Sequence, residues 1–306
     1  MGDTHYSVLL NESIELLNIK SDGIYVDGTF GRGGHSKAIL AKLGKNGRLI
    51  AFDKDLEAIE YAKQNILDER LLVVHDSFAN LKKYLRSNNI KQIDGLLLDL
   101  GVSSPQLDNA SRGFSFSKDA KLDMRMDITR GSSLKEWINK VEEPELDQIL
   151  WRYGEERFHK RIAHQIIKLR SIKPITTTAQ LAKIIEDSIP FRDKGQHPAT
   201  RSFQALRIVI NNELNDLEQI LDDVPDLLSI YGRVVVISFH SLEDRIVKSK
   251  FNELSKAKEL PKWVIANNEK DINYKIIAKK VKATDTEINE NVRSRSAILR
   301  CLEKLK

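Results

Sequence analysis

The sequence predicts an α/β protein in which an open, mostly parallel sheet is interrupted by an all-helical insertion. Four short apolar runs alternate with helix-like segments, and these runs are 24–26, 48–52, 71–74 and 95–98. Alternation of this kind is typical of a parallel sheet. It stops between about 109 and 210, where only helical patterns are found. The predicted division is therefore a discontinuous sheet domain, 1–110 with 211–306, around a helical domain, 111–210.

The sheet domain is built from elements that local patterns predict. The apolar runs are apolar throughout, which is typical of strands covered by helices on both faces. In 55–70, Leu56, Ile59, Ala62 and Ile66 recur at three- and four-residue spacing, which predicts an amphipathic helix. Strand and helix alternating at this pitch indicate right-handed βαβ units.

The insertion and the C-terminal part of the chain also have clear periodicities. Phe158, Ile162 and Ile166 lie on one helical stripe, and 203–221 is predicted as one long amphipathic helix. Three further strands are predicted after this helix, the last two as antiparallel edge strands: 233–239, 274–281 and 296–302.

Composition limits the compartment and the partners. The net charge of +5 is compatible with a polyanionic partner without requiring one. Cys301 is the only cysteine, which excludes an internal disulfide framework and a zinc–thiolate cluster. Apolar runs reach only about seven residues, far below the ~20 that span a bilayer. The polar first ten residues do not resemble a secretory signal. We expect a cytoplasmic protein with no membrane partner.

The stretch 27-DGTFGRGGHS-36 comes directly after the first apolar run. Gly31, Gly33 and Ser36 almost match the dinucleotide fingerprint G-x-G-x-x-G, with serine in place of the third glycine. In open α/β sheets, ligands bind beyond the carboxyl ends of the strands, so this turn should approach one. The alternatives are a dinucleotide, another nucleoside, or a tight turn without a ligand.

Polar residues come after the other predicted strands. Asp53 ends the second strand 22 residues after Gly31, at the spacing where a carboxylate grips a ribose diol. Asp76 and Phe78 come after the third strand and are candidates to border an adenine ring; for Asp76, an ordinary strand-end role is equally acceptable. Asp99 ends the fourth strand, where it would face the charged end of the ligand.

These carboxylates discriminate between cofactors. A pyrophosphate requires helix-terminal amides and positive potential, so Asp99 would oppose it. A ligand with a cationic amino-acid tail would instead favour Asp27 and Asp99. S-adenosylmethionine has that tail, a ribose and an adenine, and its methyl transfer requires alignment but no metal.

The sequence closely resembles the ribosomal RNA small-subunit methyltransferase H family, also called MraW. The matching stretches run nearly end to end and include TFGRGGHS, AFDKD, DLGVSSPQLD, LDMRMD, YGEERFHKRIA, HPATRSFQALRIVINNEL and ISFHSLEDRIVK. Departures are small: Ala120-Lys121 stands where the family usually has Gly-Pro, and Val292 where proline is usual.

The resemblance implies a Rossmann-like, S-adenosylmethionine-dependent methyltransferase sheet with a helical insertion. It implies transfer of a methyl group to the exocyclic N4 of a cytosine in the decoding centre (P-site region) of 16S rRNA. The partner would be 16S rRNA or the small ribosomal subunit. The cofactor-binding residues that it implies are Gly33, Gly34, His35, Asp53, Phe78, Asp99 and Gln106.

The turn Ser103-Ser104-Pro105 is a candidate catalytic element. A cytosine amino nitrogen is a weak nucleophile, and acceptors for its hydrogens would aim its lone pair at the methyl group. The turn partly matches the (D/N/S)PP(Y/F/W) turn of amino-methyltransferases. Asp99 would accept one amino hydrogen or bind the cofactor, and the target base would have to be unstacked or flipped.

The insertion offers a candidate RNA surface. Seven basic residues lie within 152–173, namely Arg152, Arg157, Lys160, Arg161, Lys168, Arg170 and Lys173. Phosphate contact by some of them is expected, and a solvated helix face is the alternative. His159 and His164 do not share a helical face, and His197 and His240 are isolated in sequence, so no metal site is predicted. Trp137, Trp151 and Trp263 are expected to fill cores or edges.

Two rival classes remain open. One is a dinucleotide-dependent dehydrogenase, which Ser36 and Asp99 disfavour. The other is a non-catalytic RNA-binding protein with a dead nucleoside pocket, which the intact glycines and carboxylates disfavour. Monomer and homodimer are both open.

Overall fold

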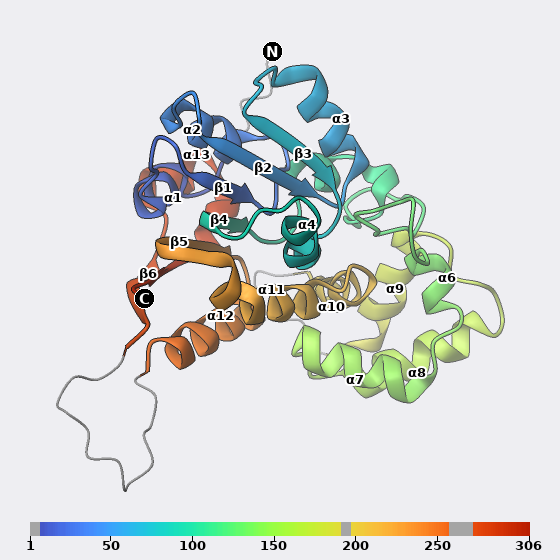
Figure 1. Ribbon diagram of the computed structural model, residues 1–306. Helices are drawn as coiled ribbons and strands as arrows, with labels where there is room; N and C mark the ends of the chain where they lie inside the picture. Colours follow the sequence, from blue (N-terminus) through green and yellow to red (C-terminus); the bar gives the residue numbers. More distant parts are fainter. Residues whose placement is uncertain (1–6, 191–196, 257–271) are drawn as a thin grey trace, which may run out of the picture. The chain divides into compact units, whose positions relative to one another are not determined.

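The computed structural model describes residues 7–190, 197–256 and 272–306 (Figure 1). The chain forms two compact units, which we describe separately. The first is Met1–Gly101 with Leu214–Lys306, and the second is Val102–Glu213. The predicted boundaries, at 110/111 and 210/211, stay a prediction. Trp263 lies outside the described residues.

The first unit contains a seven-stranded sheet of order β3-β2-β1-β4-β5-β7-β6. The strands are β1 (Ile24–Asp27), β2 (Arg48–Asp53), β3 (Leu71–His75), β4 (Ile93–Asp99), β5 (Leu228–Ser238), β6 (Tyr274–Val281) and β7 (Ile298–Lys304). Strands β1 to β5 pair in parallel, and β7 pairs antiparallel with both β5 and β6. The predicted α/β class and the antiparallel edge are confirmed. The strand order reverses between β1 and β4, which is the switch point where such sheets bind ligands.

Helices cover both faces of this sheet. They are α1 (Leu10–Leu17), α2 (Gly34–Lys42), α3 (Leu56–Asn65), α4 (Leu81–Ser87), α11 (Glu213–Leu227), α12 (Ser241–Leu254) and α13 (Asp285–Glu290), with the 3-10 turns η1 (Phe78–Asn80) and η3 (Val292–Ser296). Leu96, Leu98 and Val236 pack with α4, α11 and α12, whereas Leu97 and Val235 pack with α1 and α2. Burial on both sides explains why the strands are apolar throughout.

The single cysteine lies in the core on the side of the sheet that α1 and α2 cover. Cys301 on β7 is buried and forms no disulfide. Burial raises the pKa of its thiol to about 12, because the interior disfavours the thiolate. The thiol therefore contributes to core packing and has low reactivity.

The second unit is helical in the residues that the structure describes. It contains α5 (Ser104–Asp108), the 3-10 turn η2 (Ala110–Arg112), α6 (Leu134–Ile138), α7 (Glu143–Gly154), α8 (His159–Arg170), α9 (Thr178–Ser188) and α10 (Thr200–Ile210). One isolated antiparallel bridge joins Lys121 and Thr177. The core includes Ile162 and Ile166 of the predicted stripe, with Phe158 packed against it.

The prediction of one long helix over 203–221 is wrong. Helix α10 ends at Ile210, and α11 begins at Glu213. Asn212 lies between them with a φ of 53°. The side chain of Asn211 accepts from Met126 N at 2.7 Å and donates to Met124 O at 2.9 Å. These bonds, which hydropathy does not reveal, break the helix where the chain passes from one unit to the other.

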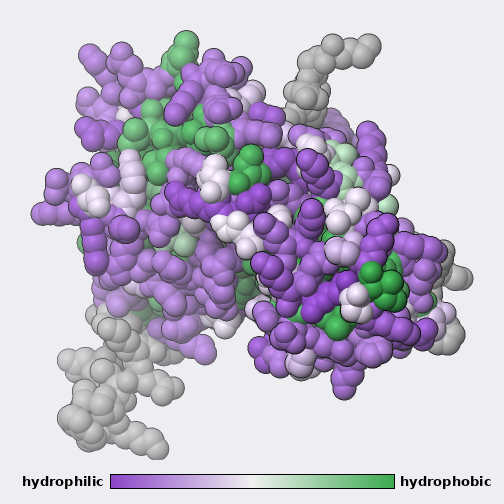
Figure 2. Space-filling model, turned by 90° about the vertical axis from the view of Figure 1, so that its right-hand side faces the viewer, coloured by the Kyte–Doolittle hydropathy of each residue, from purple (hydrophilic) through white to green (hydrophobic). Residues whose placement is uncertain are grey.

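The surface is mostly hydrophilic on the face that Figure 2 shows, with hydrophobic residues gathered in separate patches. Among the described residues, no helix is both long and apolar enough to cross a membrane. The cytoplasmic location stays a prediction.

Candidate functional site

The glycine-rich loop leaves β1 and starts α2 at the switch point. Gly33 is the residue before the first turn of α2 and has a φ of 72°, a left-handed conformation that favours glycine. A Cβ at Gly33 would lie 2.7 Å from Phe30 Cζ, whereas one at Gly31 would meet no described atom within 4 Å. The loop is therefore packed on its inner side and leaves space at Gly31.

Asp27, the last residue of β1, holds this loop in shape. Its Oδ1 accepts from Thr29 N at 3.1 Å, and its Oδ2 accepts from Ser36 Oγ at 2.7 Å. Burial raises the pKa of Asp27 to about 6, and the two hydrogen bonds oppose that shift. Ser36, which stands where a dinucleotide fingerprint has glycine, is thus a tie between β1 and α2. The sequence predicts the same role for Asp27 and Asp99, but each oxygen of Asp27 already accepts one hydrogen bond within the loop.

Asp53 connects the end of β2 to the same loop. Its Oδ2 accepts from Gly31 N at 2.7 Å, and its Oδ1 accepts from Asp55 N at 2.8 Å. Burial raises its pKa to about 6 despite these bonds. A carboxylate oxygen has two lone pairs, so each oxygen keeps the capacity to accept from a diol.

Asp99, at the end of β4, has a carboxylate that is only partly satisfied by hydrogen bonds from the described residues. Its backbone N–H donates to Thr29 Oγ1 at 2.7 Å, and its Oδ2 lies 3.7 Å from Nδ1 of the buried His35. Its Oδ1 is buried without a hydrogen-bond partner among the described residues. Burial raises the pKa of Asp99 well above its usual value, and the charges of Asp27 and Glu243 add to the shift. Buried acceptors normally have a hydrogen-bond partner, which for Asp99 Oδ1 would come from a ligand or from water.

The turn after β3 carries Phe78, which is half-buried against the sheet. Ser77 begins this turn by accepting from Ala79 N at 3.1 Å. Asp76 Oδ1 accepts from Ser77 N at 2.9 Å and from Asn80 Nδ2 at 3.0 Å. Of the two interpretations of Asp76, these bonds favour the strand-end role.

Gly34 is the first residue of α2 in the first unit, and the other four predicted residues belong to the second unit. Ser103 precedes the first turn of α5, and Ser104, Pro105 and Gln106 lie within that helix. Gln106 Oε1 accepts from Ser103 N at 2.9 Å, while Ser103 O accepts from Leu107 N at 3.3 Å. Ser103–Pro105 is therefore the start of a helix, as serine before proline favours, and not an isolated turn. The Ser103 carbonyl is used by the helix.

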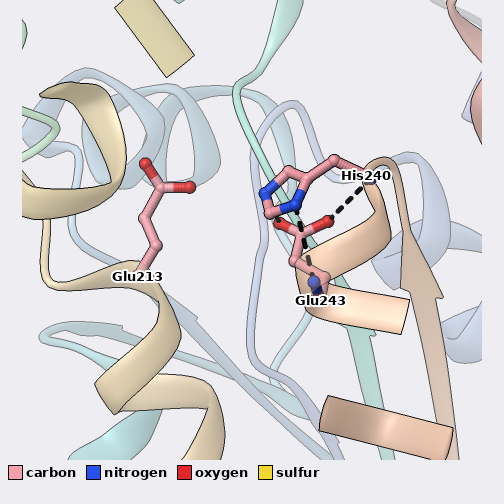
Figure 3. Close-up of side chains that lie close together, drawn as sticks. All are labelled: Glu213, His240 and Glu243. Carbon is pink, nitrogen blue, oxygen red and sulfur yellow. Dashed lines mark hydrogen bonds and ion pairs between the residues drawn. The ribbon is translucent and has the colours of Figure 1, made fainter. Parts of the chain in front are cut away.

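Sequence reasoning missed a polar pair beyond β5, drawn in Figure 3. Glu243 Oε2 accepts from Phe239 N at 2.8 Å, and Glu243 Oε1 lies 3.1 Å from Nε2 of His240. The spacing of the two residues in HSLE is that of a helix capping box, a signal that was present in the sequence. Glu213, also drawn there, belongs to the second unit, where it forms an ion pair with Arg207 at 2.9 Å.

The candidate RNA surface on α7 and α8 is partly corrected by the structure. Arg170 is only half-exposed and donates to Ile138 O at 2.7 Å, so it caps α6. The other six basic residues are exposed. Trp151 does not fill a core, because it is 58% exposed beside the His159 ring. At three- and four-residue spacing its neighbours on α7 are Asp147, Gln148 and Gly154, so helical periodicity does not place it on an apolar face.

The described site fits a nucleoside cofactor with a cationic tail. Asp99 Oδ1, which no described residue bonds, suits an ammonium group. Asp53 suits a diol, and the glycines allow close approach. A doubly wound sheet with this loop and these carboxylates defines a class: α/β proteins that bind a nucleoside cofactor at the switch point.

Comparisons with known proteins make the class specific. The profile of the MraW methylase family matches residues 2–305. The ribosomal RNA small subunit methyltransferase H of Legionella pneumophila (strain Corby) is 52% identical over 98% of this chain and 99% of its own. The protein of that name from Marinomonas sp. (strain MWYL1) is 50% identical over 98% of this chain and 97% of its own.

The chain belongs to the MraW methylase family. It is an S-adenosylmethionine-dependent methyltransferase, so the predicted class, cofactor and resemblance are confirmed. The dehydrogenase alternative is wrong. A solved structure of a putative rRNA-methylase from Clostridium thermocellum, 13% identical, covers 98% of this chain and 100% of its own at a TM-score of 0.47; the assignment rests on the sequence matches.

Proposed function

We propose that this enzyme methylates the exocyclic N4 of a cytosine in the decoding centre (P-site region) of 16S rRNA. Relatives about half identical over the whole chain are named for the ribosomal RNA of the small subunit, which supports that substrate. The observation that carries the chemistry is the buried Oδ1 of Asp99 at the switch point, which has no hydrogen-bond partner within 7–190, 197–256 and 272–306. An amino group, unlike a ring carbon, offers hydrogens that such an oxygen can accept.

The residues proposed to hold the cofactor are Gly33, Gly34, His35, Asp53, Phe78, Asp99 and Gln106. Bound S-adenosylmethionine would supply an electrophilic methyl group on a sulfonium. Asp53 would accept from the ribose, and Phe78 would contact the adenine. The His35 ring lies 3.2 Å from Val8 O and 3.7 Å from Asp99, so its side chain orders the site and its backbone is the part left for the cofactor.

Asp99, Ser103, Ser104 and Pro105 are proposed to serve the acceptor. Ionised Asp99 would accept an amino hydrogen and so direct the nitrogen lone pair towards the methyl group. Because the Ser103 carbonyl is bonded within α5, the Ser104 hydroxyl is the better candidate for the second hydrogen. Pro105 would fix the start of that helix.

The proposed function is tested by methyl transfer from labelled cofactor to small ribosomal subunits, followed by mapping of the modified base. We expect one N4-methylated cytosine in the decoding centre. Modification at a ring carbon, or transfer to large-subunit RNA instead, would contradict the proposal. Isolated 16S rRNA and assembled subunits, compared side by side, identify the form of the partner.

The exposed basic residues of the second unit are proposed to contact RNA phosphates. Changing Arg157, Lys160 and Arg161 together to glutamine should weaken RNA binding by about tenfold or more and reduce its salt dependence, because each phosphate contact releases counterions. Filter binding at several salt concentrations measures both effects. The matched control is Arg170→Gln, whose guanidinium caps α6, and which should keep the salt slope. Equal slopes in all variants would place the RNA elsewhere.

A further inference from the structure

One face of α11 is bonded to two turns at the carboxyl edge of the sheet. Asp216 Oδ2 lies 2.6 Å from Lys54 Nζ and accepts from Ser77 Oγ at 2.5 Å. Three residues further along the helix, Gln219 Nε2 donates to Ala79 O at 2.9 Å. Residues three apart share a helix face, so both side chains address the same edge.

The partners of this face are neighbours of the proposed nucleoside-binding residues. Lys54 comes directly after Asp53, and Ser77 and Ala79 flank Phe78 on both sides. The two turns are also joined to each other, since the His75 ring contacts Lys54 O at 2.9 Å. The Asp216 and Gln219 bonds end on Lys54, Ser77 and Ala79, which lie just beyond the strands, so they act on the segments that hold Asp53 and Phe78.

The bonds of Asp216 are largely protected from water, whereas the Gln219 side chain is exposed. Asp216 is 7% exposed, and its side chain receives both a charged and a neutral donor. Charge-assisted hydrogen bonds between buried groups are stronger than neutral or exposed ones. Ion pairs at the surface of α11 contribute little to stability. An example is Asp222, whose side chain is 68% exposed and which pairs with Lys250 of α12.

We propose that Asp216 and Gln219 form a clamp that positions the nucleoside-binding turns and thereby sets cofactor affinity. They are positioning residues: each acts through Lys54, Ser77 or Ala79 and not by touching the cofactor. The clamp sits on the helix that begins directly after the Asn211–Asn212 break, where the chain returns from the second unit. This inference rests on the proposed placement of the nucleoside by Asp53 and Phe78.

The test compares Asp216→Asn with Asp223→Asn, using S-adenosylhomocysteine as the probe in calorimetry. Asp223 is on the same helix and pairs with Lys82 of α4 at 2.7 Å, away from both turns. We expect Asp216→Asn to raise the Kd about tenfold, since a small displacement of binding groups has large effects. Asp223→Asn should leave the Kd unchanged, even where both variants lower the melting temperature equally.

Kinetics separate positioning from a general loss of structure. Asp216→Asn should raise the KM for the cofactor and leave the KM for RNA and the kcat at saturating cofactor unchanged. Asp216→Glu keeps the carboxylate and should retain most of the affinity. Gln219→Ala tests the second bond of the clamp and is the milder variant, should Asp216→Asn not fold.

The outcomes distinguish the two proposals. If Asp53→Ala and Phe78→Ala abolish binding while Asp216→Asn and Gln219→Ala bind as the wild type does, the clamp is wrong and the nucleoside site stands. If Asp53→Ala and Phe78→Ala bind normally, the placement of the nucleoside is wrong. Equal weakening by Asp216→Asn and Asp223→Asn would also overturn the clamp.

Discussion

Replacing Asp99 with asparagine is expected to lower the methyl-transfer rate by about 1,000-fold. The change keeps the size of the side chain but removes the charge. It also places an amide where a buried acceptor has no hydrogen-bond partner in the part of the chain that the structure describes. Loss of one positioned electrostatic or proton-accepting group reduces kcat by about 100- to 10,000-fold. Single-turnover transfer of labelled methyl to small subunits measures the effect. Full turnover in Asp99→Asn or Asp99→Ala would contradict the assignment.

Binding measurements divide the two roles of Asp99. If Asp99 holds the ammonium tail of the cofactor, the Kd for S-adenosylhomocysteine should rise in Asp99→Asn. If Asp99 accepts a hydrogen from the target amino group, the Kd should be unchanged and only kcat should fall. Its pKa is raised, so the ionised form gains population only as the pH increases well beyond about 4. Affinity for the cationic ligand should therefore increase with pH in the wild type. In Asp99→Asn that increase should be smaller.

Replacing Gly33 with alanine is expected to weaken cofactor binding by about 100-fold and to lower the free energy of unfolding by about 2 kcal/mol. The φ of 72° strains any residue with a Cβ, and the new methyl group would lie 2.7 Å from Phe30 Cζ and 2.8 Å from Ile66 Cδ1. The start of α2 must then move with the loop. Calorimetry with S-adenosylhomocysteine and denaturant unfolding measure the two effects.

The control for Gly33 is Gly131→Ala in the second unit. Gly131 has a φ of 68°, but a Cβ there would meet no described atom within 4 Å. This variant therefore measures the effect of backbone strain alone, with no steric clash and with the glycine-rich loop after β1 unchanged. Its stability should fall less than that of Gly33→Ala, and its cofactor affinity should not change. If Gly33→Ala binds the cofactor with wild-type affinity, the glycine-rich loop is not part of the binding site.

The sequence was sufficient for the sheet because burial on both faces leaves an unmistakable pattern. The runs beginning at Ile24, Arg48 and Leu71 are strands, and the predicted carboxylates lie at their carboxyl ends. What the sequence could not resolve is which oxygens are already used. Asp27 and Asp99 are both strand-end aspartates, yet Asp27 is bonded to Thr29 and Ser36, whereas Asp99 Oδ1 has no hydrogen-bond partner among the described residues.

The errors arise where side chains replace backbone interactions. Periodicity continues through 203–221, but the amide of Asn211 bonds to the backbone of Met124 and Met126 and ends the helix. In sequence, Arg170 is indistinguishable from its basic neighbours on α8. In the structure its guanidinium donates to the backbone carbonyl of Ile138. Both effects depend on residues far away in sequence, so no local pattern reveals them.

The buried thiol of Cys301 makes the protein convenient for spectroscopy. With a pKa raised to about 12, it has almost no thiolate at neutral pH, and thiolate is the form that maleimides attack. The sequence contains no other cysteine. A cysteine introduced at the exposed Lys168 would then be labelled selectively in the otherwise native protein. A fluorophore there would report the approach of RNA to α8 in real time.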